Sequence, residues 1–487
     1  MLDEELRRAA SDLRDELQHV TPPPFKPRPQ LGGRVLLVAA TVAVFVIGFA
    51  LVTRIDTGQD ADPAETPVPD SVVTDPDPNS DSDSDGDDVQ TAPEPGPAIT
   101  DVIHRPTTDM ARPQPGRFVL EPEFATIVAA VTAEDDGAVV TPIPDGAPSW
   151  NSDGSLLVLY ETGALSPGHT LYDGQSFARI GMLPFEPLDI EQLHWDPVRP
   201  NRLYFVEGTV LQSFDIESLN ADSLDPVPGT QTAITEPDLC QSKLSTALAH
   251  KPISADGSMI GLACETGSGA EWIALNLETG ETARTAATGP QAPIPTADGS
   301  RFVVSSEDGQ VMVLDATLQP TGVSFESEAS NLLVIRTDDG RDLAVTTVFS
   351  LEDEKIGSVI GFDLSTGATV PAVGLATGFP YPPAGTTMST SPAIDGLVAV
   401  SIAGVQTTAD QETLDGELLL VDFNTTAPTV YRLGHHRSAY EGTDFDRYRS
   451  TPWTALSPDG SRVLFASHWG GSAVDTFVID ITNLRNP

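Results

Sequence analysis

Apolar residues recur at helical spacing in the first 20 positions, on a stripe formed by Leu2, Leu6, Ala9, Leu13, Leu17 and Val20. Acidic residues at positions 3–5 suit a helix N-terminus, and three prolines at positions 22–24 end the segment. The pattern predicts that residues 1–34 form a short amphipathic helix followed by an extended proline stretch. Two roles stay open for residues 2–20: docking a cytoplasmic partner protein, or lying on the inner membrane surface.

Residues 35–53 contain an uninterrupted apolar run, VLLVAATVAVFVIGFALV, that is long enough to cross a bilayer as a helix. Three basic residues lie between positions 26 and 34, whereas Asp and Glu dominate beyond position 54. This asymmetry places the N-terminus in the cytoplasm and exports the rest of the chain. A cleaved signal peptide is the alternative, but its core would be unusually long and no small-x-small cleavage site follows Leu51. We expect an uncleaved, single-pass anchor in the cell membrane.

Residues 54–115 are rich in Asp, Pro, Ser and Thr and poor in aromatic side chains. Such a segment buries too little apolar surface to offset its ordering entropy, so we predict a disordered, acidic, self-repelling spacer. Within it, residues 81–86 imitate the start of a calcium-binding loop. Position twelve of that loop is Ala92 instead of a bidentate Glu, so the tract is interpreted as low-complexity sequence and no cofactor is predicted.

The pattern changes in residues 116–487, where short β-rich runs alternate with Gly, Pro, Asp and Asn turns. A motif of the form Ser-x-Asp-Gly-Ser recurs, each time followed by an apolar strand. The Asp-Gly pair permits the positive φ that a tight hairpin turn needs. Clear copies are Ser152–Ser155, Ser254–Ser258, Ala297–Arg301 and Ser457–Arg462, and weaker copies are Trp195–Pro197, Asp338–Gly340 and Ile394–Gly396.

Each copy adds a second hairpin, and a four-stranded unit of this kind cannot bury both of its faces alone. The repeat resembles those of TolB-type and WD-type β-propellers, from Phe118 to Asp480. The resemblance implies an all-β propeller of seven blades, with roughly 50 residues in each; six or eight blades are the alternatives. Ring closure is expected to pair an N-terminal strand, Phe118–Leu120 or Thr126–Val131, with the final C-terminal strands. Propellers serve binding, scaffolding and catalysis alike, so the fold alone does not give the function.

The net charge of −45 and the pI of about 4.2 exclude nucleic acid as a ligand, because binding a polyanion needs a basic surface. The two cysteines, Cys240 and Cys264, lie in the part that we expect outside the cell, where disulfides persist. A bridge between them is the favoured interpretation. Two buried thiols are the alternative, and the lack of neighbouring histidines argues against a metal site.

Candidate binding residues gather near the C-terminus. A histidine pair precedes the last repeat, a His-Trp pair follows its strand, and these connections are expected to converge on one rim of the ring. Some propeller lyases that cleave pectin-derived sugars hold a metal through histidines in such positions, but this chain matches them by residue type only, and no ligand set is assigned. Between the two pairs lies a loop whose aromatic, Arg and Asp residues suit recognition. The candidates are His435, His436, Tyr440, Arg447, Tyr448, His468 and Trp469.

A polar surface loop at the histidines, with the tryptophan packed at a blade edge, is the alternative to a site. The sequence contains no G-x-S-x-G elbow, H-E-x-x-H helix or P-loop, and no catalytic residue is predicted. Three functions follow from these patterns. The first is a membrane-anchored, extracytoplasmic propeller that binds a protein or cell-envelope ligand at one rim. The others are a glycan-processing lyase or hydrolase, and a purely structural subunit of an envelope complex.

Overall fold

The computed structural model describes residues 94–485, except for short gaps at 134–137, 163–166, 188, 218, 220–224, 247–250, 268, 290, 307–308, 327–329, 349–357, 381–385, 405–410, 439–447 and 449–450. The predicted amphipathic helix and membrane anchor lie outside the described residues, as does most of the predicted spacer. Among the residues that are described, no helix is both long enough and apolar enough to cross a membrane.

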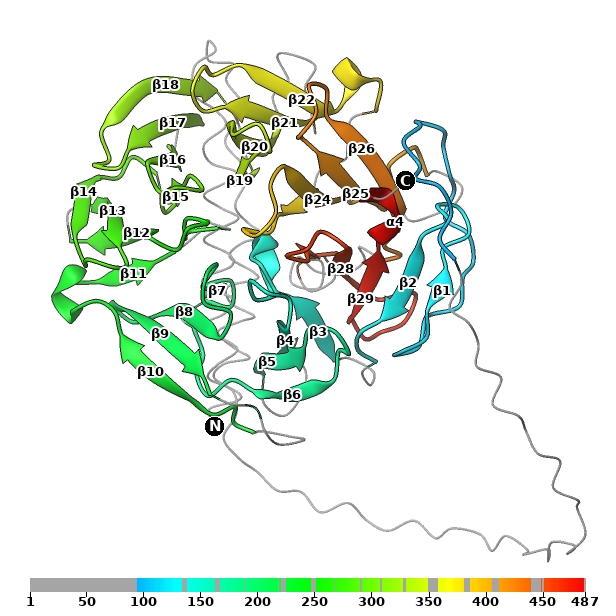
Figure 1. The fold of residues 1–487 in the computed structure, drawn as a ribbon, viewed down its shortest axis with the longest axis horizontal. Helices are drawn as coiled ribbons and strands as arrows, with labels where there is room; N and C mark the ends of the chain where they lie inside the picture. Colours follow the sequence, from blue (N-terminus) through cyan, green and yellow to red (C-terminus); the bar gives the residue numbers. More distant parts are fainter. Residues whose placement is uncertain are drawn as a thin grey trace, which may run out of the picture. The chain divides into compact units, whose positions relative to one another are not determined.

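The described strands form seven antiparallel sheets arranged as a ring, so the prediction of a seven-bladed all-β propeller is confirmed (Figure 1). Blade 1 holds β3 (Val139–Pro142), β4 (Leu156–Thr162), β5 (Gly168–Asp173) and β6 (Arg179–Met182). Blade 2 holds β7 (Leu193–Trp195), β8 (Arg202–Glu207), β9 (Val210–Ile216) and β10 (Gly229–Ala233). Blade 3 holds β11 (Lys243–Ser245), β12 (Met259–Thr266), β13 (Gly269–Asn276) and β14 (Thr282–Ala286).

Blade 4 holds β15 (Ile294–Pro295), β16 (Arg301–Ser305), β17 (Gln310–Asp315) and β18 (Pro320–Glu326). Blade 5 holds β19 (Ser330–Arg336), β20 (Asp342–Val348), β21 (Ser358–Asp363) and β22 (Thr369–Val373). Blade 6 holds β23 (Thr387–Ser389), β24 (Leu397–Ser401), β25 (Glu417–Asp422) and β26 (Thr429–His435). Blade 7 holds β27 (Thr454–Leu456), β28 (Arg462–Ser467), β29 (Asp475–Asp480), β2 (Ile127–Ala130) and β1 (Val119–Leu120). The short helices are η1 (Pro144–Gly146), η2 (Pro237–Leu239), η3 (Leu375–Thr377) and α4 (Thr482–Arg485).

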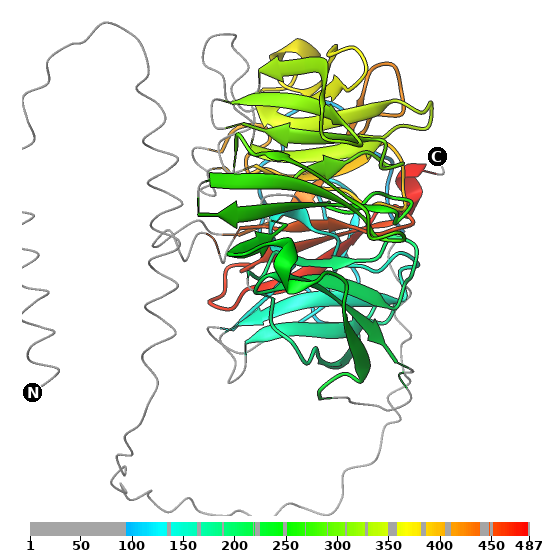
Figure 2. The same ribbon diagram turned by 90° about the vertical axis from the view of Figure 1, so that its left-hand side faces the viewer.

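The antiparallel order gives the ring two distinct faces. Turns between the first and second strands of a blade, and between the third and fourth, lie on one side, which we call the turn face. Connections between the second and third strands, and between successive blades, lie on the other side, which we call the loop face. Figure 2 shows the ring edge-on, with α4 projecting from it on the right.

The ring closes in blade 7, where strands from both ends of the described chain meet. β2 pairs with β29 from Ile127 opposite Asp480 to Ala130 opposite Phe477, and β1 then pairs with β2 at the outer edge. The predicted closure of an N-terminal strand against the final C-terminal strands is therefore confirmed. Because each blade buries its faces only against its neighbours, this single junction completes the apolar packing of the whole ring.

Apolar side chains fill the space between the blades. The Phe185 and Phe205 rings stack at 4.0 Å between blades 1 and 2, and the Phe325 and Phe362 rings stack at 4.2 Å between blades 4 and 5. Every residue of β20 is buried. β-Branched and aromatic side chains suit strands that are covered on both sides, which is why the short apolar runs of the sequence became strands.

The Asp-Gly motif works as a turn device in the repeats. In blade 7 the Asp459 Oδ1 atom accepts hydrogen bonds from the Ser461 amide at 3.0 Å and from the Ser457 hydroxyl at 2.7 Å. Gly460 has a φ of 65°, which a side chain would strain. The equivalent aspartates in blades 1, 3 and 4 make the same contact with the serine two residues later. The recurrent motif is thus explained by local hydrogen bonding.

Residues 94–115, which we call the strap, lie along the outer edge of blades 6 and 7. The Gly96 amide donates to the Ala125 carbonyl at 2.7 Å, and Ile99 and Pro115 form isolated bridges with Arg432 and Ala130. The prediction of a disordered spacer up to residue 115 is wrong for this segment, and the propeller unit begins earlier than the predicted boundary at residue 116. Several of its partners, such as Arg432 and Trp469, lie more than 300 positions away, so no local sequence pattern predicts these contacts.

Cys240, which follows η2, and Cys264 of β12 form a disulfide that closes a loop with a sequence separation of 24. In the chain-entropy description a loop of this length stabilises the fold by about 3 kcal/mol. We expect the Cys240→Ser/Cys264→Ser double variant to lose about that much free energy of unfolding in urea titrations. Reductant is expected to weaken the wild type and leave the double variant unchanged. Equal sensitivity of both proteins to reductant would contradict this prediction.

Candidate functional site

The predicted histidine pair lies beneath the strap. His435 ends β26 and is 2% exposed, and its ring meets the Phe124 ring edge-on at 5.0 Å. His436 is fully buried; its Nε2 atom lies 3.0 Å from the Ile402 carbonyl and its Nδ1 atom accepts from the Ser438 amide at 3.0 Å. Both rings are therefore enclosed by protein.

Two buried ion pairs surround these histidines. Arg432, which has no exposed surface in its side chain, binds both carboxylate oxygens of Glu417 at 2.7 and 2.5 Å. Its remaining N–H groups donate to the strap carbonyls of Asp101 and Ile103 at 3.2 and 2.5 Å. Arg437 likewise forms two hydrogen bonds with Glu121, at 2.7 and 3.1 Å. A buried charge left without partners is costly, so the strap completes a set that the blades alone leave unfinished.

Trp469 fastens the other end of the strap. Its indole N–H donates to the Met110 carbonyl at 3.1 Å, and its ring packs against the Phe477 ring at 4.8 Å. The Arg437 guanidinium lies 4.9 Å above the same indole. His468 precedes it and is half-buried. His435, His436 and Trp469 thus belong to one packed region at the edge of blades 6 and 7, whereas Tyr440 and Arg447 lie outside the described residues.

Burial sets the protonation of the two histidines. It lowers the pKa of His435 to about 3, with the neighbouring Arg437 adding to the effect, and it lowers the pKa of His436 to about 4. Both rings are neutral over the physiological range. Neutral imidazole can ligate a metal, but no three His, Cys, Asp or Glu side chains lie together in a metal-binding arrangement within the described part of the chain.

Tyr448 lies in a different environment, on the loop face. It follows β26 in the connection between blades 6 and 7, and its hydroxyl donates to Glu191 in the connection between blades 1 and 2. The Trp453 indole donates to the Tyr448 carbonyl at 3.3 Å, and the two rings meet edge-on at 5.4 Å. These contacts hold Tyr448 against a distant inter-blade connection, which places its aromatic side chain and the Glu191 carboxyl group side by side.

Glu191 was not among the predicted residues. Burial raises the pKa of its carboxyl group, and the hydrogen bond from Tyr448 opposes that rise. Next to it, Gln192 accepts from the Thr246 amide at 3.0 Å, and the His194 Nε2 atom lies 2.9 Å from the Thr246 hydroxyl. The sequence signal was polar residues leading into a short apolar strand, which is too common to single out a site. We call Glu191, Gln192, Tyr448 and Trp453 the loop-face cluster.

No protein-family model matches the chain, and no curated protein matches it. Among solved structures, an oligogalacturonate lyase from Vibrio parahaemolyticus is similar, with 12% identity, a TM-score of 0.53, and coverage of 75% of this chain and 96% of the lyase. An oligogalacturonate lyase in complex with manganese matches with 12% identity and a TM-score of 0.52, over 75% and 95% of the two chains. The Pan2 WD40 domain of Neurospora crassa matches with 12% identity and a TM-score of 0.39, over 72% and 97%. At this identity the likeness to the lyases shows the propeller fold alone.

The buried, neutral His435 makes a testable contribution to acid stability. Its folded pKa of about 3 lies below the ordinary value, so between pH 6.5 and 5 the unfolded chain takes up a proton that the folded chain refuses. Its share of the free energy of unfolding is complete well above pH 6.5 and falls by about 2 kcal/mol on reaching pH 5. We expect His435→Phe, which keeps the aromatic contact with Phe124, to lose correspondingly less stability on acidification.

The measurement is urea unfolding at several pH values. Substitution of the exposed His104 by Asn serves as the control and is expected to keep the wild-type pH dependence. An unchanged slope in His435→Phe would show that this ring does not resist protonation in the folded state.

Proposed function

We propose that the chain is a membrane-anchored binding protein whose propeller recognises a protein or cell-envelope ligand outside the cytoplasm. The observation that carries the proposal is the contact between Tyr448 and Glu191, because it joins two inter-blade connections that are 257 positions apart. A Tyr448 side chain held in this way is preorganised, and preorganisation lowers the entropic cost of binding.

The composition of the loop-face cluster supports a binding role. The half-buried Tyr448 offers aromatic area, which dominates the energetics of many interfaces, the buried Trp453 supports it, and Glu191 adds a partly desolvated carboxyl group. The predicted candidates His435, His436 and Trp469 are used in internal packing, so Tyr448 and the half-buried His468 are the described candidates that remain for ligand recognition.

The proposed location rests on the charge pattern around residues 35–53, with basic residues before the apolar run and acidic residues after it. The disulfide between Cys240 and Cys264 suits an oxidising compartment. Residues 2–20 are proposed to engage a cytoplasmic partner or the inner membrane surface. No role for nucleic acid is proposed, because the chain is strongly acidic.

Site-directed photo-crosslinking in the source cells tests this proposal. A benzophenone amino acid at Glu186, which is exposed in the same connection as Glu191, reports on the loop face, and one at the exposed Gln319 reports on the turn face. We expect a defined adduct at position 186 and none at 319. Removing the hydroxyl in Tyr448→Phe is expected to lower the adduct yield roughly tenfold, the effect of losing a contact worth about 1.4 kcal/mol.

Tyr431→Phe is the matched control, since this half-buried tyrosine lies on β26 away from the loop-face cluster and is expected to leave the yield unchanged. Equal adducts at both reporter positions, or a yield that ignores Tyr448, would refute recognition by the loop-face cluster.

Glycan processing is the second candidate, favoured by the likeness of the fold to two oligogalacturonate lyases, one of them solved with manganese. The burial of His435 and His436 favours the binding role instead, because neither ring is accessible to a substrate. We expect the purified full chain to carry no stoichiometric manganese by elemental mass spectrometry. It is also expected to release no unsaturated product from oligogalacturonate, with His435 and His468 variants indistinguishable from wild type. One manganese per chain together with product formation would establish the lyase.

A further inference from the structure

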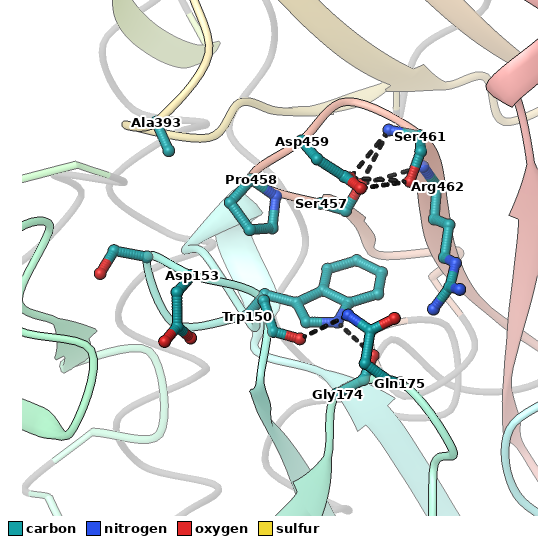
Figure 3. A pocket seen from close by; sticks show the side chains of 12 residues that line it. Trp150, Asp153, Gly174, Gln175, Ala393, Ser457, Pro458, Asp459, Ser461 and Arg462 are labelled. Atoms are coloured by element: carbon teal, nitrogen blue, oxygen red, sulfur yellow. Dashed lines mark hydrogen bonds between the residues drawn. The ribbon is translucent and has the colours of Figure 1, made fainter.

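The first hairpin turn of each blade gives the seven blades a common reference position. In blade 7 the Ser457 amide donates to the Arg462 carbonyl at 2.9 Å, and the Ser457 hydroxyl donates to Asp459 at 2.7 Å (Figure 3). In blade 6 the Thr390 hydroxyl makes the corresponding bond, to the Leu397 carbonyl at 2.8 Å. The amide bond across the hairpin recurs in the other five blades, from Asn151, Asp196, Ser254, Thr296 and Thr337. These residues mark the turn-face end of the innermost segment of each blade.

The position three residues before this reference carries a charge in blade 3 alone among the seven described copies. In blade 3 it is Lys251, which is 9% exposed. In the other blades the residue is buried and is apolar or carries a hydroxyl: Pro148, Leu193, Pro293, Val334, Thr387 and Thr454. A lysine is rarely buried unless it is paired. The amine of Lys251 therefore interrupts an otherwise uncharged set of innermost residues.

The Lys251 ammonium group forms no hydrogen bond and no ion pair with the described residues. The charges that act on it through space are those of Asp395, in the first turn of blade 6, and Asp342, at the start of β20 in blade 5. Blades 5 and 6 are two and three blades away from blade 3 around the ring. The lysine side chain therefore extends toward the axis of the ring, on the turn-face side.

The carboxylate of Asp342 is also incompletely paired. It is 5% exposed, and its Oδ2 atom accepts from Arg301 at 2.8 Å, whereas its Oδ1 atom has no hydrogen-bond partner among the described residues. The axis thus combines a buried amine with carboxylates that lie near it without touching it. Such surroundings oppose an anionic ligand and stabilise a positive charge that stays on the lysine nitrogen.

Desolvation makes this amine more nucleophilic at neutral pH than an ordinary lysine. Burial lowers the pKa of Lys251 to about 8, and the charges of Asp395 and Asp342 oppose that fall. The fraction of neutral amine at pH 7 is therefore larger than the fraction in an exposed lysine by a factor on the order of 100. Lysines in desolvated sites are the residues that proteins use to form Schiff bases with carbonyl compounds.

We propose that Lys251 is a covalent binding site for a small aldehyde, which it holds as an imine near the axis of the ring. The neutral amine attacks the carbonyl carbon and forms the C–N bond, and the carbonyl oxygen leaves as water with the two amine protons. No oxidant or reductant is needed. The imine nitrogen then takes a proton from solvent, and the resulting positive charge is stabilised by Asp342 and Asp395.

This site goes beyond the proposed function and shares no residue with the loop-face cluster. Lys251 lies at the turn-face end of its blade, so a failure of the aldehyde site leaves recognition at the loop face untouched. The reverse also holds, because the labelling experiment below needs no protein or envelope ligand.

Reductive alkylation of the full chain in detergent tests the proposal, with acetaldehyde as the probe and cyanoborohydride to trap the imine. The chain has four lysines, at positions 26, 243, 251 and 355, so peptide mass spectrometry resolves each of them. Lys243 is the internal reference, since it is more exposed and lies 3.8 Å from Asp189. At pH 7 we expect Lys251 to be alkylated at least fivefold faster than Lys243.

The pH dependence separates a desolvated amine from an ordinary one. We expect the rate at Lys251 to level off above about pH 8, because the amine is then neutral. An ordinary exposed lysine becomes neutral only near pH 10.4, so the ratio of the two rates is expected to fall by pH 10.

Asp395→Asn removes a charge that favours the protonated amine, and is expected to raise the rate at Lys251 about twofold at pH 7. Asp338→Asn, at an exposed position in the first turn of blade 5, is the matched control and is expected to leave the rate unchanged. Thermal unfolding of each variant verifies that the ring is intact. The proposal is overturned if Lys251 reacts no faster than Lys243 at pH 7, or if its rate keeps rising to pH 10.

Discussion

The junction between β2 and β29 is the constraint on which the rest of this structure depends. A propeller blade is apolar on both faces, so an open ring leaves two of them exposed. Four paired positions, from Ile127–Asp480 to Ala130–Phe477, bring the two ends of the described chain into one sheet. Closure alone does not finish the edge of the neighbouring blade 6, because Arg432 of β26 needs more acceptors than Glu417 of β25 offers. The strap supplies them through the carbonyls of Asp101 and Ile103, which is why this polar-looking segment is ordered.

The sequence predicted the turns and strands that depend on short-range interactions, and it did not predict the contacts between residues far apart in the chain. The Asp-Gly turns, the apolar strands and the count of seven blades follow from hydrogen bonds and periodicity within a few residues, as the contacts of Asp459 show. The end of the spacer was placed too late because the strap is held by Arg432 and Trp469, more than 300 positions away. The composition of a segment indicates how much apolar surface it can bury by itself. It does not indicate whether its backbone carbonyls will accept hydrogen bonds from a buried guanidinium such as that of Arg432.

The candidate site shows the same division. His435 and Trp469 were predicted as binding residues from their residue types. The same aromatic side chains can instead form internal cation–π and aromatic contacts, as they do here at the edge of blades 6 and 7. Glu191 lies in no recognisable sequence motif, and it becomes a candidate binding residue only because the fold places Tyr448 beside it. Arg301 and Arg462 both follow an Asp-Gly-Ser turn, yet Arg301 forms an ion pair with Asp342, and Arg462 lies over the Phe177 ring. The neighbouring blade supplies the ion-pair partner of Arg301, and the repeat motif of blade 4 gives no sign of that partner.

The course of the strap also decides which surfaces are free. It contacts Asn483 beyond β29 on the turn-face side and Trp469 on the loop-face side, and so it runs along the edge of the ring between the two faces. The strap's hydrogen-bond partners Asn483, Arg432 and Trp469 all lie outside the loop-face cluster. If residues 35–53 anchor the protein, as we propose, tension on the tether acts first on the strap. Its hydrogen bonds to Arg432 and Trp469 must yield before the pairing of β2 with β29 is loaded, so the strap shields the junction that keeps the ring closed.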